Sequence, residues 1–233
     1  MTNQTIGIIG AMQPEIDILK KDMSIRDTTK IAGIEYYSGE LYGKNVVLVE
    51  SGIGKVNASI VTTLLIQQFN ATLVINTGVA GSLSNKLDIT DIVVGNSMVH
   101  HDVDATNFSY DYGQVPGMPL HYEGDKNAVS IAVKALEEYG DVNFHKGLIV
   151  SGDSFIDDDK RKSFILSEFN EALAVDMESA PIAQVCHRLE VPCLIMRSMS
   201  DKADNSADMN YEEFLLKACI HSSNTVKLVL RKL

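Results

Sequence analysis

The sequence Ile6-Gly7-Ile8-Ile9-Gly10-Ala11-Met12-Gln13-Pro14-Glu15 decides the fold. An apolar run at 6–9 is followed by small residues and then by a helical pattern over about 12–21. Apolar runs without polar alternation are typical of strands that are buried on both faces, as in a parallel sheet covered by helices. The opening stretch therefore predicts the first strand-turn-helix unit of an α/β protein.

The same pattern recurs along the chain. Further apolar runs occur at 46–49, 73–75, 92–94, 148–150, 173–175 and 193–196, and a hairpin strand is expected at about 34–41. Helical patterns occur at about 56–69, 126–139, 159–169, 178–190 and 211–231. This alternation predicts an α/β fold, a three-layer αβα domain around a central, mostly parallel mixed sheet. No linker or repeat interrupts the pattern, so we expect one domain over residues 1–233.

The charge balance excludes several classes of partner. Lys and Arg number 20 and Asp and Glu 31, which gives a net charge of −11. Without a basic block, neither nucleic acid nor an anionic membrane is an expected partner. No apolar run approaches the ~20 residues of a membrane-spanning helix. The first residues also lack the pattern of a signal peptide, and we expect a cytoplasmic protein.

The cysteines and histidines do not predict a metal site. Cys186, Cys193 and Cys219 have neither metal-ligand spacing nor an even number, so we expect core thiols in a reducing compartment. His100 and His101 are adjacent in the sequence, and adjacent side chains on a strand point to opposite faces. We therefore expect neither a metal nor another cofactor.

Acidic residues and one arginine follow several of the predicted strands. Glu15 follows the first, Glu178 follows the run at 173–175, and Arg197 and Asp201 follow the run at 193–196. In open α/β sheets, ligands bind beyond the carboxyl ends of the strands, so these side chains are expected to converge. Three carboxylates and a guanidinium suit acid–base hydrolysis. The alternative is that each acid only caps a helix.

Two glycine-rich turns do not fit a nucleotide-phosphate site. Gly54-Lys55 is followed by Val56 where a phosphate loop needs Ser or Thr, and Asn57 replaces the last glycine of a dinucleotide fingerprint. The glycines are expected instead to allow close approach of the backbone to a neutral ligand. No nucleophile-elbow motif is present, which argues against covalent catalysis.

The segment 100–124 differs from the rest of the chain. It is rich in Asp, Tyr, Gly and Pro and carries several large apolar side chains, among them Phe108, Tyr110, Tyr112 and Pro116. A loop of this length in a compact domain is usually functional or a contact surface. We expect a subunit interface or a ligand lid.

Seven motifs in order along the chain resemble one family, the 5′-methylthioadenosine/S-adenosylhomocysteine nucleosidases, a hydrolytic branch of the nucleoside phosphorylase superfamily. They are IGIIGAMQPE (6–15), SGIGKVN (51–57), NTGVAG (76–81), YDYGQVP (110–116), GLIVSGDSFI (147–156), VDMES (175–179) and MRSMSDKAD (196–204). The resemblance covers nearly the whole chain. It implies a nucleoside phosphorylase-like fold and an enzyme that cleaves the adenine–ribose bond of these adenosyl thioethers, in salvage of the by-products of S-adenosylmethionine and methionine metabolism.

The resemblance also implies roles for individual residues. Glu15 is expected to be the base that activates water, and Asp201 the acid that protonates adenine at N7. Met177 and Glu178 are expected to hold the ribose hydroxyls, and Arg197 to help fix the water and Glu178. The remaining contacts implied are Phe155, Ile156 and Gly81 around the purine, Met12, Ile53 and Tyr211 as walls for the ribose and 5′-thio group, and Phe108, Tyr110 and Pro116 completing the neighbour's 5′ pocket in a homodimer.

The chemistry of the bond is consistent with these roles. N-glycosidic cleavage builds positive charge on the ribose, which carboxylates stabilise, and anionic adenine leaves poorly without an acid. Asp201 must therefore have a raised pKa, whereas Glu15 must act as a base. Two positions depart from the family pattern, since Val79 stands where many members have Ser and Asp176 where Glu is common.

Two other functions stay open. A phosphorylase would use phosphate in place of water, but the loop after the first strand offers Glu15 and no Arg. A non-catalytic sensor of adenosyl ligands would have no need for opposed carboxylates. The sequence does not rank the possible 5′-substituted adenosines.

Overall fold

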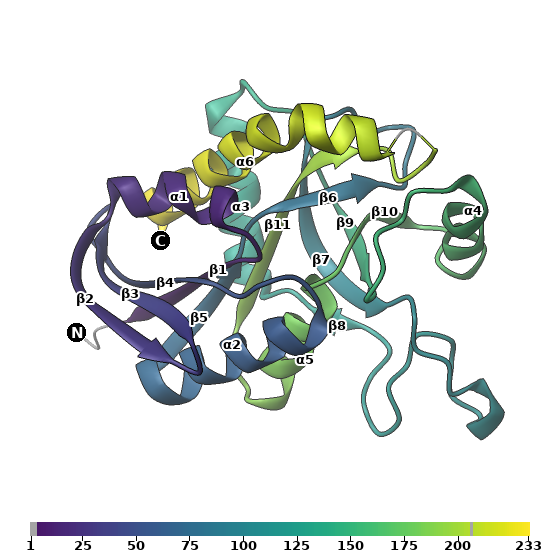
Figure 1. Ribbon diagram of the computed structural model, residues 1–233, viewed down its shortest axis with the longest axis horizontal. Helices are drawn as coiled ribbons and strands as arrows, with labels where there is room; N and C mark the ends of the chain where they lie inside the picture. Colours follow the sequence, from purple (N-terminus) through teal and green to yellow (C-terminus); the bar gives the residue numbers. More distant parts are fainter. Residues whose placement is uncertain (1–3, 206) are drawn as a thin grey trace.

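The structure is a computed structural model that describes residues 4–205 and 207–233 (Figure 1). A mixed sheet lies at its centre, with strand order β2-β3-β4-β1-β5-β11-β6-β10-β9-β7-β8. The strands are β1 (Thr5–Gly10), β2 (Ser24–Ile31), β3 (Ile34–Leu41), β4 (Lys44–Glu50), β5 (Ala71–Asn76), β6 (Val79–Ser82), β7 (Ile92–His100), β8 (Tyr122–Glu123), β9 (Phe144–Ser151), β10 (Ala172–Asp176) and β11 (Cys193–Asp201).

Helices cover both faces of this sheet (Figure 1). They are α1 (Gln13–Asp22), α2 (Lys55–Phe69), α3 (Lys126–Tyr139), α4 (Asp159–Glu168), α5 (Ser179–Arg188) and α6 (Ala207–Lys232). Apolar side chains of α1, α3 and α6 pack in one core cluster with one face of the sheet, and those of α2 and α5 pack in a second cluster. The predicted three-layer α/β fold is thereby confirmed. Its layers are held together by the apolar surface that the helices and the sheet bury against each other.

Strand β11 connects two parts of the sheet. Its first residues pair with β5, its last residues pair with β6, and on its other edge it pairs antiparallel with β7. Since β6 pairs with β10, β10 with β9 and β9 with β7, these strands close into a barrel with β11. The sequence did not indicate this closure, which depends on pairings between distant segments.

The direction of β10 corrects one expectation about the site. β11 runs parallel to β5 and β6, but β10 runs antiparallel to β6 and so opposite to β11. The residues after β10 therefore approach the site from the direction opposite to Asp201. The strands do bring the expected acids together, but not along one common carboxyl edge.

Three of the strands were not predicted: β2, β6 and the two-residue β8, which lies in the segment expected to be a loop. β2 has the sequence SIRDTTKI and is mostly exposed at the edge of the sheet, so it lacks the apolar pattern of a buried strand. β6 is only four residues long and was expected as a turn. Two strands are longer than predicted, since β7 continues to His100 and β11 to Asp201. Arg197 and Asp201 therefore lie within β11 rather than after it. Helix α6 begins at Ala207, before its predicted start. The one-domain organisation stays a prediction.

The segment between β7 and β8 is largely irregular. It contains one short 3-10 helix (Thr106–Phe108), and the Phe108 side chain is 78% exposed. Tyr112 instead packs against Phe164 and Phe169, with ring centroids 5.7 and 6.1 Å apart. The predicted loop therefore divides into a part that packs on α4 and a tip that extends from the molecule (Figure 1).

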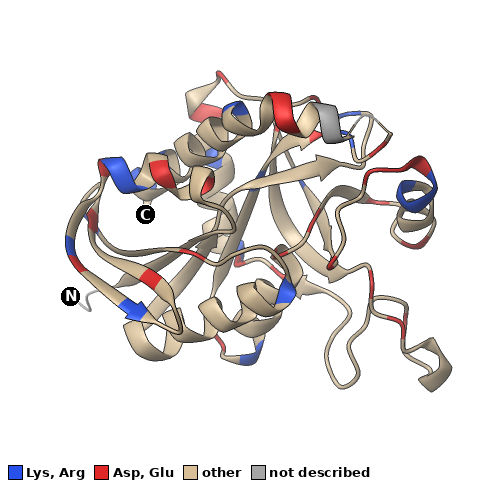
Figure 2. Ribbon diagram, in the orientation of Figure 1, with Lys and Arg blue, Asp and Glu red and all other residues tan. Residues whose placement is uncertain are grey.

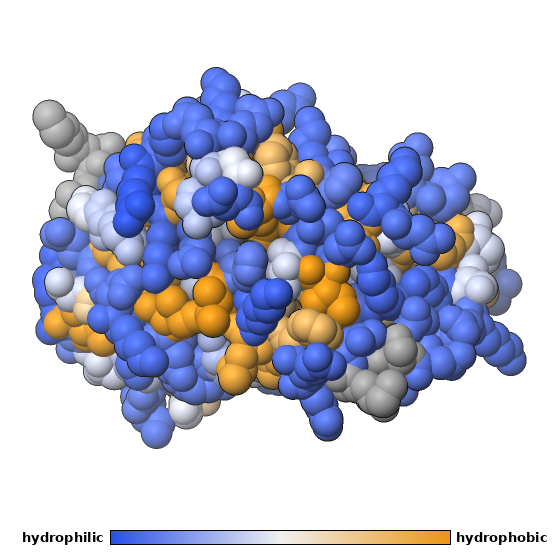
Figure 3. Space-filling model, turned by 90° about the horizontal axis from the view of Figure 1, so that it is seen from above, coloured by the Kyte–Doolittle hydropathy of each residue, from blue (hydrophilic) through white to orange (hydrophobic). Residues whose placement is uncertain are grey.

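Most charged residues lie on the outer helices, loops and edge strands of the ribbon, and basic and acidic residues are interspersed (Figure 2). On the side covered by α6, apolar residues form separate patches among hydrophilic ones (Figure 3). None of the described helices has the length and apolar character needed to cross a bilayer. Cys186, Cys193 and Cys219 are buried free thiols.

Candidate active site

A cavity of about 590 Å³ lies where the ends of β1 and β10 meet β6, β11 and the start of α6. Carboxyl groups enter it from three separate segments, those of Glu15, Glu178 and Asp201. The full lining is Ala11, Met12, Glu15, Ile53, Val79, Ala80, Gly81, Phe155, Val175, Asp176, Met177, Glu178, Ser200, Asp201, Tyr211 and Glu212. The size suits a small organic ligand, and the mixture of apolar walls with a few polar groups is typical of a ligand site.

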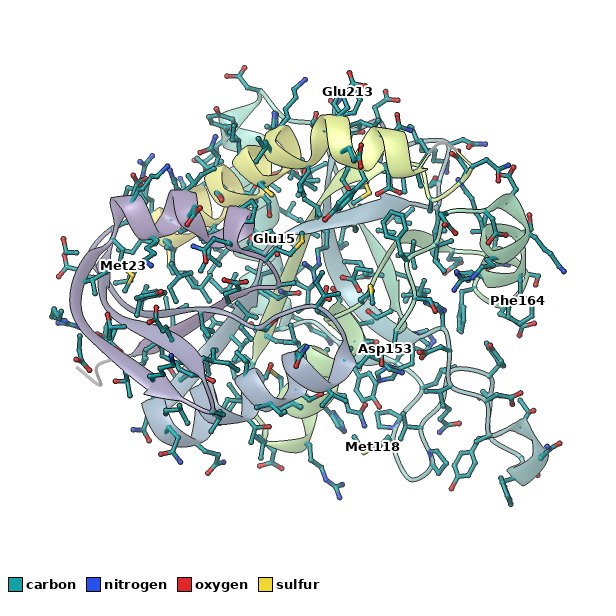
Figure 4. The ribbon with its side chains drawn as sticks, viewed as in Figure 1. Glu15, Met23, Met118, Asp153, Phe164 and Glu213 are labelled. Carbon is teal, nitrogen blue, oxygen red and sulfur yellow. The ribbon has the colours of Figure 1, made fainter. Side chains whose placement is uncertain are left out.

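Glu15 lies at the centre of the molecule, in the first turn of α1 (Figure 4). Its Oε2 accepts from the backbone N–H groups of Ala11 (2.5 Å) and Met12 (3.0 Å), and its Oε1 accepts from Val79 N–H at 2.9 Å. Burial raises the pKa of Glu15, while the Arg197 guanidinium and these three donors act to lower it. The acid thus caps its own helix with one oxygen and reaches across the cavity wall to β6 with the other.

Gly78 makes room for this arrangement. Its φ is +148°, and a side chain there would clash with both the Glu15 carboxylate and the Arg197 guanidinium. The glycine of the NTG motif therefore lets the turn between β5 and β6 pass close to the two charged groups.

Arg197 lies behind the cavity wall and is fully buried. Its Nε donates to Asp176 Oδ2 at 2.7 Å, its Nη2 to Glu178 Oε2 at 3.3 Å and its Nη1 to the Thr77 carbonyl at 3.3 Å. Asp176 also accepts a 2.5 Å bond from the Ser151 hydroxyl and a short one from Ser179. Removing one partner of such a buried ion pair costs about 3–5 kcal/mol, so this network fixes the geometry around Glu178.

Glu178 precedes α5 but does not cap it. Its Oε1 instead accepts from Gly54 N–H at 2.9 Å, at the start of α2. Burial raises the pKa of Glu178 to about 7, against the opposing effects of Arg197 and of the Gly54 N–H. The capping alternative therefore fails for this acid, whose carboxylate joins α2 to β11 at the cavity.

Asp201 ends β11 and is almost fully buried. It accepts from Ala203 N–H and from the Ser200 hydroxyl, both at 2.8 Å. Burial is the largest effect and raises the pKa of Asp201, which the nearby Asp204 raises further. A Cβ on Gly81 would come within 2.8 Å of Asp201 Oδ1, so the glycine leaves the carboxyl group accessible. The side chain is thus placed to hold a proton.

The remaining walls are largely apolar. Tyr211 donates its hydroxyl to Met12 Sδ at 3.1 Å, and its ring meets that of Phe155 edge to face with centroids 5.6 Å apart. Ile53 is 51% exposed at the rim of the cavity. These aromatic and sulfur-containing side chains can pack against the flat face of a base or against a thioether.

Not every predicted residue lines this cavity. Arg197 lies behind its wall, and Ile156 is buried and lines a different cavity. The loop residues Phe108, Tyr110 and Pro116 lie outside it within the chain itself. The sequence also did not single out Ser200, Glu212 or the extent of the Asp176 network. Ser200 lies in the motif MRSMSDKAD, which predicted roles for Arg197 and Asp201 alone, and Glu212 lies on an exposed turn of α6 with no motif of its own.

The two adjacent histidines have other surroundings. His100 Nε2 lies 2.8 Å from Gln184 Oε1, and both histidine side chains are buried. Within residues 4–205 and 207–233, no group of three or more His, Cys, Asp or Glu side chains is arranged to hold a metal ion.

Comparison with known proteins places the chain in a family. The family model for the phosphorylase superfamily matches residues 5–233. A protein from Exiguobacterium named 5′-methylthioadenosine/S-adenosylhomocysteine nucleosidase is 49% identical over 228 residues, 98% of each chain. The chain belongs to this nucleosidase family. A second member, from Staphylococcus epidermidis, is 48% identical over 98% of this chain and 100% of its own.

Solved structures of the nucleosidase family have the same fold. That of the Neisseria meningitidis enzyme in complex with methylthio-immucillin-A superposes with a TM-score of 0.97 at 42% identity, covering 99% of this chain and 100% of that one. The resemblance noted in the sequence is thereby confirmed over essentially the whole length.

Proposed function

We propose that this chain is a purine nucleosidase that hydrolyses the N-glycosidic bond of 5′-methylthioadenosine and S-adenosylhomocysteine, releasing adenine and the 5-thio-substituted ribose. The observation that carries the proposal is that two buried carboxyl groups, Glu15 and Asp201, line one cavity in a member of this family. Hydrolysis of such a bond needs a base for water and an acid for the leaving group.

Glu15 activates the water. Its carboxylate has Arg197 beside it and three backbone N–H donors, all of which favour the charged form that a base requires. The negative charge also faces the ribose, where positive charge develops as the bond breaks. Val79 contributes its backbone N–H to Glu15, so the departure from Ser at this position leaves the main contact in place.

Asp201 donates a proton to adenine at N7. The proton moves from the carboxyl oxygen to the ring nitrogen as the electrons of the glycosidic bond pass to the base, so adenine leaves neutral. The raised pKa of Asp201 supports this role, because the group must be protonated before the bond breaks.

The other lining residues bind the rest of the substrate. Glu178 and Met177 hold the ribose hydroxyls, and Arg197 orients Glu178. Phe155 packs on the purine beside Gly81, and Met12, Ile53 and Tyr211 surround the 5′-thio group. Ile156 does not line the cavity, and it contributes main-chain hydrogen bonds to the purine. No cofactor takes part in this scheme, because the substrate supplies the leaving group and water supplies the nucleophile.

We also propose a homodimer in the cytoplasm. The exposed Ile53 leaves the rim of the cavity open, while the exposed Phe108, with Tyr110 and Pro116, lies on a loop that does not reach its own cavity. In a homodimer, this loop of one copy covers the open cavity rim of the other copy. The three free thiols suit a reducing compartment.

Water rather than phosphate is the co-substrate in this proposal. A phosphate group beside the ribose would meet the Glu15 carboxylate, and Arg197 is already engaged by Asp176 and Glu178. Both features disfavour an anion at this position.

The decisive test is to incubate the pure protein with methylthioadenosine, with and without inorganic phosphate, and to identify the sugar product. We expect adenine and free methylthioribose at equal rates in both conditions. Phosphate-dependent formation of the sugar 1-phosphate would establish a phosphorylase instead, and tight binding without adenine release would establish a sensor.

A further inference from the structure

The first turn of α2 has no cap of its own. The residue before it, Gly54, has a φ of +99° and no side chain. The Lys55 N–H instead donates to Asp153 Oδ1 at 2.7 Å, from a residue 98 positions further along the chain. Since unpaired N–H groups at a helix start need an acceptor, Asp153 supplies the missing cap from a distant segment.

The neighbouring amide of the same turn serves the active site. Gly54 N–H donates to Glu178 Oε1 at 2.9 Å. Two carboxylates thus share the positive end of one helix, with Asp153 on the Lys55 amide and Glu178 on the Gly54 amide. A shift of this turn would therefore move a donor that orients the ribose-binding acid.

A third carboxylate fixes Asp153 itself. Asp102 Oδ2 accepts from the Asp153 N–H at 2.9 Å, and Asp102 Oδ1 accepts from Lys55 Nζ at 2.6 Å. We call Lys55, Asp102 and Asp153 the α2 clamp. It joins the start of α2 to the segment that leads, two residues later, to Phe155 on the cavity wall. Figure 4 shows Asp153 beside the start of α2.

We propose that Asp153 is a positioning residue, which through the α2 clamp holds both the Gly54 N–H that orients Glu178 and the segment that carries Phe155. Asp153 does not line the cavity, so it acts through these neighbours. The inference deepens the proposed function and rests on it for the assignment of Glu178 to ribose and Phe155 to the purine.

The pH dependence separates positioning from a general contribution to folding. Glu178 must be ionised to accept from the ribose, and the Gly54 N–H lowers its pKa. Losing that donor raises the pKa, so kcat/KM begins to fall at a higher pH as the solution is acidified. The other charged or titratable groups facing Glu178 are unchanged by a substitution at Asp153; they are Arg197 on β11, Asp176 on β10, Glu15 on α1 and Tyr211 on α6.

The test compares Asp153→Ala with Asp153→Asn and with Asp157→Ala, an acid of the same segment that lies outside the cavity. We expect Asp153→Ala to lower kcat/KM about tenfold, the equivalent of one lost N-cap, and to move the acid limb to higher pH. Asp153→Asn is expected to keep most of the wild-type kcat/KM and nearly the wild-type acid limb, because its amide oxygen still accepts from the Lys55 N–H. Asp157→Ala is expected to match the wild type in both measurements. An unchanged Asp153→Ala enzyme, or loss of activity with an unmoved acid limb, would overturn the proposal.

Binding of adenine, measured by calorimetry, keeps this test separate from the test of the proposed function. If the wild type releases no adenine, the proposed function fails, but the clamp is still judged by whether Asp153→Ala weakens adenine binding. Equal affinity would contradict it. If Asp153→Ala does not fold, Asp102→Asn, which loosens the clamp and leaves the cap, must shift the acid limb in the same direction for the proposal to stand.

Discussion

Glu15 and Asp201 line the same cavity but have different electrostatic surroundings. Glu15 has three backbone N–H donors and the Arg197 guanidinium, which all favour its anion. Asp201 has one backbone donor, one hydroxyl and the charge of Lys162, which favour its anion, but the nearby Asp204 favours its protonated form. Burial raises the pKa of both groups, so the difference lies in their neighbours rather than in their depth. A buried carboxyl group is thus suited to be a base or an acid by what surrounds it.

The largest effect on activity is expected from a substitution of Glu15. Glu15→Gln is expected to lower kcat for methylthioadenosine by about 10²–10⁴-fold, because an amide cannot take a proton from water. The measurement is adenine release under saturating substrate. Since the amide also places N–H₂ against backbone donors, a thermal unfolding curve is the control for folding. A variant that keeps more than a few per cent of the activity would remove Glu15 from its role.

The pH profile tests the Asp201 side. Asp201 must be protonated to act as the acid, and burial raises its pKa, so activity falls as the pH rises through that value. Asp201→Asn carries no titrating group there, and the alkaline limb of its remaining activity should flatten. The measurement is kcat against pH for both proteins. If the variant keeps the wild-type alkaline limb, another group is the acid.

A smaller effect on activity is expected from a substitution away from Glu15 and Asp201, in the loop that carries Phe108. In the proposed homodimer, the loop covers the 5′ group of the partner's substrate and does not touch the reacting atoms. Phe108→Ala is therefore expected to raise KM roughly fivefold, or about 1 kcal/mol, with little change in kcat. Tyr139→Ala, another exposed aromatic residue, is the matched control. Sedimentation of both variants reports the dimer. Unchanged KM would show that the carboxylate pair works without the loop.

The sequence singled out acidic residues that line the cavity better than it indicated the strand pairings that bring them together. Glu15 and Asp201 each follow an apolar run and belong to motifs of known order, so they could be singled out. The closing of the barrel through β11 and β7, and the reversed direction of β10, depend on strand pairings that no local pattern records. The same holds for the α2 clamp, in which Asp153 caps a helix 98 positions away. β2 was missed because an exposed edge strand has no buried face to impose a pattern.

The most direct test of the acid–base assignment changes the leaving group. A 5-methylthioriboside of 4-nitrophenol needs no proton to leave, whereas adenine does. On this substrate Asp201→Asn should come within about tenfold of the wild type, while Glu15→Gln should still lose about 10²–10⁴-fold, since water must be activated in either case. If Asp201→Asn is as defective on the nitrophenyl substrate as on methylthioadenosine, Asp201 is not the acid, and the contrast between the two carboxyl groups does not decide their roles.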